Sequence, residues 1–131
     1  MRVLLDTHMW AWSLLEPERL APSVKAVLGD PETELWLSPI SVWELSLLIE
    51  RGRIEIEGSA VGWVEEALAR VPMREAVLSN AVALRSRMLE LSHDDPADRF
   101  LAATAAVYGL TLVTADDRLM SGKEYEVLPN R

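Results

Sequence analysis

The sequence contains no cysteine and no long apolar run, and each absence excludes classes of protein. Without cysteine the chain forms no disulfide, no zinc–thiolate site and no thiol nucleophile. No segment approaches the roughly 18 consecutive apolar residues that a membrane-spanning helix needs. The chain opens as MRVLLD, without a basic region followed by an apolar core and a cleavage site. We therefore expect a cytoplasmic protein that is not associated with a membrane.

Basic residues are also scarce, with 13 Lys and Arg against 21 Asp and Glu and a formal net charge of −8. This balance argues against a broad phosphate-binding surface. Either the acids serve ordinary solubility or some of them are gathered to hold cations, and their positions must decide. Half of the 131 residues are hydrophobic, which is enough for one core. We expect a single domain over residues 1–131.

Short strands that alternate with helices predict an α/β fold. Apolar segments at 3–5, 34–38 and 111–114 predict strands, 125–128 predicts a last strand at a sheet edge, and 53–58 could be a short extended piece. Apolar spacing and start or stop residues predict helices at about 8–16, 22–28, 41–51, 61–71, 75–91, 96–108 and 116–120. Strands separated by helices form parallel sheets through right-handed crossovers. The sequence therefore predicts a central parallel sheet flanked by helices on both sides.

Four acidic residues fall where this fold would bring them together. Asp6 directly follows the first strand, Glu44 follows the second by one helical turn, and Asp116 follows the strand at 111–114 by one residue. Asp98 lies in the first turn of the helix that Pro96 opens. In an open parallel sheet, ligands bind in the crevice outside the carboxyl ends of the strands. We expect the four carboxylates to converge there.

Four neighbouring carboxylates repel and raise one another's pKa values, and a divalent cation removes that conflict. Mg²⁺ prefers such hard oxygen ligands and keeps several of its waters. A metal held in this way can orient a water, lower its pKa and stabilise the charge of a phosphodiester in the transition state. The sequence therefore predicts a Mg²⁺ or Mn²⁺ site at Asp6, Glu44, Asp98 and Asp116, with one or two ions.

Each acid also has a structural interpretation. Glu44 could close a capping box with Ser41, Asp95 and Asp98 could both be helix-start residues, and Asp116 could cap a short helix. Asp6 is harder to explain in this way, because an acid at the end of an apolar strand is costly unless it is paired or bound to metal. Taken singly the acids favour structural roles, and their joint placement favours a site.

Other polar and aromatic residues carry weaker signals. His8 and His93, the only two histidines, show no two-histidine metal spacing, and we interpret them as surface or core-edge residues. Arg99 and Arg118 each lie close after a cluster acid and could contact phosphate, although salt bridges are the simpler interpretation. Trp10 and Trp12 cannot both face one core from the same helix, so one of them could contact a second subunit.

Four segments in order resemble the PIN-domain nucleases and, within them, the VapC-type toxins of bacterial toxin–antitoxin pairs. The matching segments are V-L-L-D-T-H at 3–8, S-P-I-S-V-W-E-L at 38–45, H-D-D-P-A-D-R-F-L-A-A-T-A at 93–105 and L-V-T-A-D-D-R-L at 112–119. Any one of these motifs is weak. Together, over nearly the whole chain, they are specific.

The resemblance implies a PIN fold and metal-dependent endonuclease cleavage of RNA. Carried over by position, the catalytic and metal-binding residues are Asp6, Glu44, Asp98 and Asp116, with the adjacent Asp117 as an alternative for the fourth. Asp95 matches a frequent companion acid, and with Thr7 and Thr114 it is expected to support the cluster from outside. The resemblance further implies a homodimer silenced by a small antitoxin whose C-terminal part enters or covers the acidic cleft.

Three other functions compete with this one. A phosphatase using Asp6 as nucleophile would carry a second acid two residues later, where this chain has His8. A non-catalytic PIN module acting as an RNA-binding adaptor would tolerate the loss of a cluster acid, and all four are present. A 5′-nuclease acting on DNA would need clamp and arch elements for which the chain lacks room.

Overall fold

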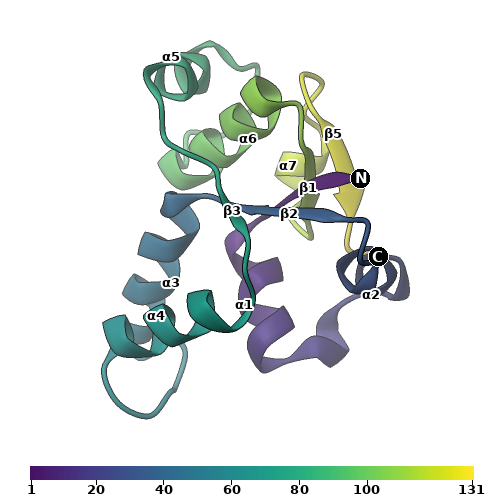
Figure 1. The fold of residues 1–131 in the computed structure, drawn as a ribbon. Coiled ribbons are helices and arrows are strands. Elements are labelled where there is room, and N and C mark those ends of the chain that lie inside the picture. The colour runs from purple at the N-terminus through teal and green to yellow at the C-terminus, as the bar shows by residue number, and fades with distance from the viewer.

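Five short strands form one fully parallel sheet in the order β3-β2-β1-β4-β5. We describe a computed structural model of residues 1–131 (Figure 1). The strands are β1 (Arg2–Leu5), β2 (Glu34–Leu37), β3 (Arg74–Glu75), β4 (Thr111–Thr114) and β5 (Glu126–Pro129). The predicted parallel α/β sheet is confirmed, and β5 lies at its edge as the sequence indicated.

Helices cover both faces of this sheet, and each face has its own core. The helical elements are α1 (Thr7–Leu15), η1 (Pro17–Arg19), α2 (Pro22–Gly29), α3 (Pro39–Glu50), α4 (Ala60–Arg70), α5 (Asn80–Met88), α6 (Pro96–Tyr108) and α7 (Asp117–Met120). In Figure 1, α1 to α4 lie below the sheet and α5 and α6 lie above it. The flanking helices on both sides are therefore also confirmed.

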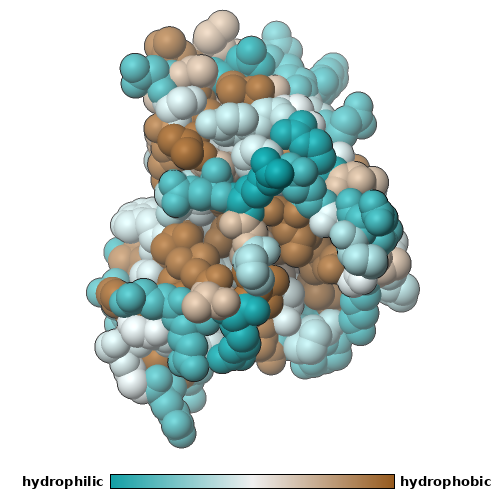
Figure 2. Space-filling model, viewed as in Figure 1, coloured by the Kyte–Doolittle hydropathy of each residue, from teal (hydrophilic) through white to brown (hydrophobic).

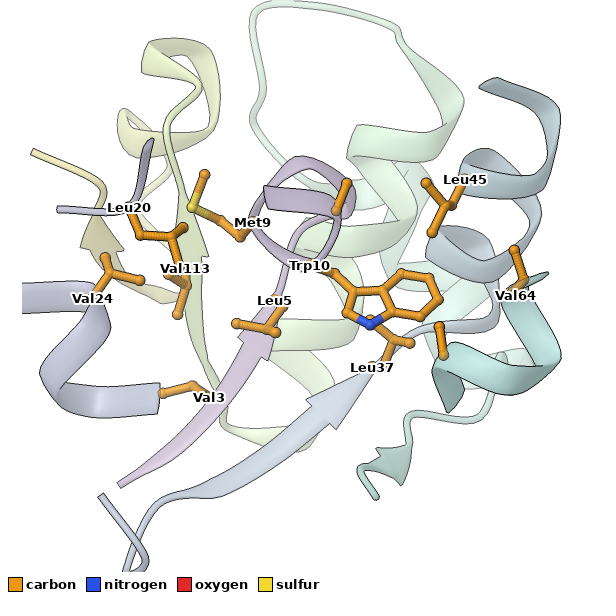
Figure 3. Close-up of a cluster of buried hydrophobic side chains, with 12 residues drawn as sticks. Val3, Leu5, Met9, Trp10, Leu20, Val24, Leu37, Leu45, Val64 and Val113 are labelled. Carbon is orange, nitrogen blue, oxygen red and sulfur yellow. The ribbon is translucent and has the colours of Figure 1, made fainter. Parts of the chain in front are cut away.

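Alternate residues of the central strands supply the two cores. Val3 and Leu5 of β1 pack against α1 to α4, in a cluster that includes the buried Trp10 (Figure 3). Leu4 points the other way and packs with Leu101 and other residues of α6. Burying one such aliphatic side chain contributes about 1.5–3 kcal/mol. The two-sided burial explains why the central strands read as continuous apolar runs.

Helix α3 begins earlier than the sequence suggested. Ser38 caps it, with its Oγ accepting a hydrogen bond from the Ile40 N–H at 3.1 Å, and Pro39 occupies the first helical position. The predicted capping box from Ser41 to Glu44 is wrong, because proline pre-sets the helical φ two residues before Ser41. Glu44 therefore lies in the second turn and has no capping role.

Two further predictions of local structure are wrong. The single helix predicted over 75–91 is a short strand, β3, followed by α5, which Ser79 caps by accepting from the Val82 N–H at 3.2 Å. Pairing of β3 with β2 overrides helical propensity before Ser79. Residues 53–58, predicted as a short extended piece, form bends and irregular backbone with no strand.

The carboxyl ends of β1 and β4 are adjacent, and this arrangement positions the site. Leu5 pairs with Val113, and the Asp6 N–H continues the ladder by donating to the Val113 carbonyl at 3.1 Å. Helices α1 and α7 therefore start side by side from neighbouring strands. Separately, none of the helices combines the length and the apolar character needed to cross a membrane.

Candidate active site

A hollow of about 340 Å³, here called the acid pocket, lies at the carboxyl ends of β1 and β4. Its lining includes Asp6, Glu44, Asp98 and Asp116, together with Asp95 and Thr7. The convergence expected from the strand ends is therefore observed. Thr114 does not line the hollow, but its hydroxyl donates a hydrogen bond to Asp6.

Asp6 is the most deeply buried acid of the pocket, with 6% of its surface exposed. It caps α1, with Oδ1 accepting from the Met9 N–H at 2.8 Å, while Oδ2 accepts from the Thr114 hydroxyl. Burial raises the pKa of Asp6 because the charged form loses water, and the charge of Asp98 adds to the rise. The two hydrogen bonds oppose the rise without cancelling it.

Asp98 lies in the first turn of α6, where the sequence placed it. Asp95 caps this helix by accepting from the Asp98 N–H at 3.1 Å. The Asp98 side chain is 17% exposed, and its Oδ2 lies 3.1 Å from Nε2 of His93. Burial raises the pKa of Asp98, and the charges of Asp95 and Asp116 raise it further.

Asp116 has the opposite electrostatic environment. It caps α7 by accepting from the Arg118 N–H at 2.9 Å, and the Arg118 guanidinium donates to both of its oxygens at 3.2 and 3.0 Å. These hydrogen bonds lower the pKa of Asp116. The same guanidinium lies 3.7 Å from Oδ2 of Asp98. The predicted salt bridge of Arg118 is confirmed.

Thr114 joins the two strand-end acids. Its Oγ1 accepts from the Asp116 N–H at 3.0 Å while its hydroxyl hydrogen is donated to Asp6. A second buried threonine, Thr7, donates to the Ser41 hydroxyl at 3.1 Å and so links α1 to α3. That link holds the helix that carries Glu44. Ser41 itself is buried and caps nothing, contrary to the sequence interpretation.

Glu44 is half-buried on the wall of the acid pocket and forms no side-chain hydrogen bond or ion pair. It faces the three aspartates from α3, while the aspartates come from the starts of α1, α6 and α7. Its side chain is therefore free to turn toward a cation in the hollow.

Two residues have roles that the sequence interpretation did not assign. His93 contacts Asp98 and is not merely a surface or core-edge residue. In the sequence, the only indication of this contact is that His93 lies five residues before Asp98, on a loop that must fold back over the start of α6. Arg99 was predicted to bind phosphate or a carboxylate, and this is wrong. It is 5% exposed, and it donates to the carbonyls of Ser86 at 2.8 Å and Leu89 at 2.9 Å.

The chemistry of the pocket fits a hard divalent cation, although its acids are not drawn tightly together. No three of the histidine and acidic side chains lie close enough to hold one ion between them. Carboxylate oxygens are nonetheless the ligands that Mg²⁺ and Mn²⁺ prefer, and Mg²⁺ usually takes only one or two carboxylates directly and keeps several waters. Burial and neighbouring carboxylates raise the pKa values of Asp6 and Asp98, and a bound cation would favour the charged form of both.

Comparison with known proteins gives a family match and a close relative. A family model described as PIN domain matches residues 3–122. Ribonuclease VapC22 from Mycobacterium tuberculosis is 37% identical to this chain over 122 residues, which cover 91% of this chain and 90% of that protein.

Solved structures agree on the fold. VapBC2 from Rickettsia felis, bound to a DNA fragment from its promoter, matches with a TM-score of 0.70 and 14% identity over 98% of both chains. A toxin–antitoxin complex from Klebsiella pneumoniae matches with a TM-score of 0.70 and 20% identity, again over 98% of both chains. At sequence identities this low, the similarity shows that the fold is shared.

Proposed function

This chain belongs to the PIN-domain family, and we propose that it is a VapC-type ribonuclease toxin that cleaves RNA with Mg²⁺ or Mn²⁺ held in the acid pocket. One observation carries the proposal. Asp6, Glu44, Asp98 and Asp116 line a single hollow at the carboxyl ends of β1 and β4. Two of them, Asp6 and Asp98, have pKa values raised by burial.

We propose that Asp6 and Asp98 hold the metal most directly, with Glu44 and Asp116 completing the cluster. A bound divalent ion would supply a water of lowered pKa and positive charge for the phosphodiester. The protein's own part is to fix the carboxylates. Thr114 and the start of α1 hold Asp6, and His93 contacts Asp98. Arg118, with 56% of its side chain exposed, can turn from Asp116 toward a phosphate.

The test is cleavage of labelled RNA by the purified chain in Mn²⁺ and in EDTA. We expect Asp6→Asn, Glu44→Gln, Asp98→Asn and Asp116→Asn each to abolish cleavage while the fold is kept. Losses should exceed the roughly 10–100-fold typical of residues that only support metal ligands.

Asp117→Asn is the matched control, because Asp117 is exposed beside Asp116 and does not line the acid pocket. It should cleave like the wild type. Melting must be checked for Asp6→Asn and Asp116→Asn because both positions cap a helix, although asparagine caps about as well as aspartate. A wild type that binds RNA but never cleaves it with either metal would favour the adaptor function instead.

We also propose a small antitoxin as partner and the cytoplasm as the place of action. An acidic pocket in a chain of net charge −8 suits a basic inhibitory segment, since complementary charge speeds and orients association. Release of RNA cleavage by removing that segment from a co-purified complex would support this.

A homodimer is the last part of the proposal. The sequence suggested that Trp10 or Trp12 contacts the second subunit, but Trp10 is 1% exposed and Trp12 lines the acid pocket, so we place the interface elsewhere. Hydrophobic side chains gather where α3, α4 and β3 meet (Figure 2), around a hollow lined by Val42 and Leu68. Light scattering should give twice the 14.7 kDa of one chain. A monomer at micromolar concentration would contradict it.

A further inference from the structure

A second hollow lies beside the acid pocket and is the larger of the two, at about 530 Å³. We call it the Trp12 groove. His8 and Trp12 of α1 line both hollows, so the two share one wall. The groove continues from there over η1 to the loop between α3 and α4, where Arg53 forms part of its lining.

The walls of the groove combine a flat aromatic surface with two arginines and two glutamates, Glu16 and Glu55. The Arg19 guanidinium carbon lies 4.0 Å from the centre of the Trp12 ring, and Glu16 holds that guanidinium at 3.2 Å. The His8 ring is 6.0 Å from Trp12 on the side shared with the acid pocket. Arg53 is exposed and forms no ion pair. Leu48 and Ile54 supply apolar surface between these groups.

We propose that the Trp12 groove binds the nucleotide next to the scissile phosphodiester, with its base stacked against the Trp12–Arg19 pair. This rests on the proposed ribonuclease function. A single strand whose phosphodiester enters the acid pocket reaches the shared His8–Trp12 wall with its adjacent residue. Unstacked RNA bases bind on aromatic rings and on guanidinium planes, which are the two surfaces present here. Arg53 then faces the next phosphate.

The net charge of the chain supports stacking as the mode of binding. At −8 the protein lacks the basic surface that draws most nucleic-acid-binding proteins to their ligands. Stacking needs no net positive charge, because every base has a π face. Two arginines and one tryptophan beside the acid pocket therefore give an acidic protein a local means of holding RNA.

The experiment combines a substitution in the protein with the loss of one base from the RNA, each alone and both together. The probe is a labelled single-stranded RNA that the wild type cleaves at one position, prepared with one abasic nucleotide at each place around that position. For the wild type, removing the base of one nucleotide next to the cleaved bond should raise KM by about 5- to 150-fold, which is the range for the loss of one stacked base. Trp12→Ala should raise KM for the intact RNA similarly, with kcat nearly unchanged.

When Trp12→Ala acts on the RNA that lacks this base, the two increases in KM should not multiply, because either change alone already removes the same stacking contact. Trp12→Phe should restore most of the affinity. Trp43→Ala is the matched control, because Trp43 is 58% exposed and lines neither hollow, and it should leave KM unchanged.

Several results would overturn the proposal. The groove does not bind a base if the increases in KM multiply at every abasic position. The same conclusion follows if no abasic position raises KM for the wild type. A wild-type series in which no abasic position raises KM rejects the proposal even if Trp12→Ala fails to fold. An unchanged KM in folded Trp12→Ala also rejects the proposal and points to a partner-protein segment as the occupant. Absence of any cleavage by the wild type rejects the ribonuclease function itself, which is a distinguishable outcome.

Discussion

Asp6 and Asp116 are the same residue type in the same local role, yet their electrostatic environments are opposite. Both cap a helix that starts at a strand end, and both are hydrogen-bonded to Thr114. Asp6 is buried among neutral donors, and its pKa is raised, whereas Asp116 is more open, is neutralised by Arg118, and has a lowered pKa. Capping therefore fixes where a carboxylate lies, while burial and counter-ions decide what it can bind.

The comparison divides the acid pocket into two parts. Asp6 and Asp98 form an inner pair whose pKa values are raised by burial, although His93 and Arg118 lie close to Asp98. Asp116 forms an outer part that already has an internal cation. A divalent ion relieves more unfavourable charge at the inner pair than at Asp116, because the energy of a charge pair grows as water is removed. We expect metal to act mainly on the inner pair.

The largest expected effect is stabilisation by metal. An ion that binds only the folded state stabilises it by about 2.7 kcal/mol when its concentration is about 100 times its Kd, which corresponds to several degrees of melting temperature. Millimolar Mg²⁺ should therefore raise the melting temperature, and EDTA should return it to the metal-free value. Mn²⁺ should act at lower concentration, because it binds oxygen and nitrogen sites more tightly. Differential scanning fluorimetry measures both.

Asp6→Asn sharpens this result. The variant removes one charge of the inner pair but keeps a side chain that can cap α1. Without metal it should melt at or above the wild type, and it should respond less to metal. Equal shifts in the variant and the wild type would show that Asp6 is not a ligand. No shift in the wild type at several millimolar would reject the metal cluster as a whole.

The positions of the acids could be predicted from the sequence because they depend on strand ends and helix starts. Asp6 and Asp116 follow apolar strand segments, and Pro96 marks the helix start that brings Asp98 to the same crevice. These are local signals joined by one topological rule, that parallel strands end at a common edge. The parallel sheet and the acid pocket followed from them.

What could not be predicted depends on contacts between distant segments. The short strand β3 forms only because β2 offers an edge, so the sequence around Arg74 and Glu75 shows no distinct strand pattern. The contact between His93 and Asp98 needs a loop whose path Arg99 holds through backbone carbonyls. The division into an inner and an outer part needs burial, which the spacing of the acids does not encode.

Arg118→Ala should partly remove the difference between the two parts. Without the guanidinium, Asp116 loses the hydrogen bonds that lower its pKa. Metal affinity should increase, because a positive charge next to the site is gone, while KM for RNA should rise, because a phosphate contact is lost. Changes of about threefold are expected in each, since exposed ion pairs are weak. Calorimetric titration with Mn²⁺ and steady-state cleavage measure the two effects.

Arg118→Lys should restore most of both values, and Arg70→Ala, an exposed change outside the acid pocket, should alter neither. The decisive result is that Arg118→Ala strengthens metal binding and weakens RNA binding. Affinities that fall together would mean that Arg118 only holds α7 in place.

The smallest expected effect is on the pH dependence of unfolding without metal. An aspartate whose pKa is raised on folding binds protons more tightly in the folded state, so its contribution to stability falls as pH rises from the ordinary 3.8 through the raised value. Asp6 and Asp98 both act in this direction. Asp116 acts in the opposite direction, and its stabilisation is complete above 3.8 and is lost as pH falls through its lowered value.

The two parts of the pocket therefore act in different pH windows, and urea unfolding in EDTA from about pH 4 to about pH 8 separates them. Asp6→Asn should flatten part of the decline in stability that the wild type shows above 3.8, and adding Asp98→Asn should flatten more. Asp116→Asn should lower stability by a constant amount across this range, because its own titration lies below it. The effect is small because the Met9 and Thr114 hydrogen bonds already offset part of the burial of Asp6. If stability declines with pH in the double variant as it does in the wild type, the charges of the inner carboxylates are already compensated in the folded protein. The contrast with Asp116 would then not hold.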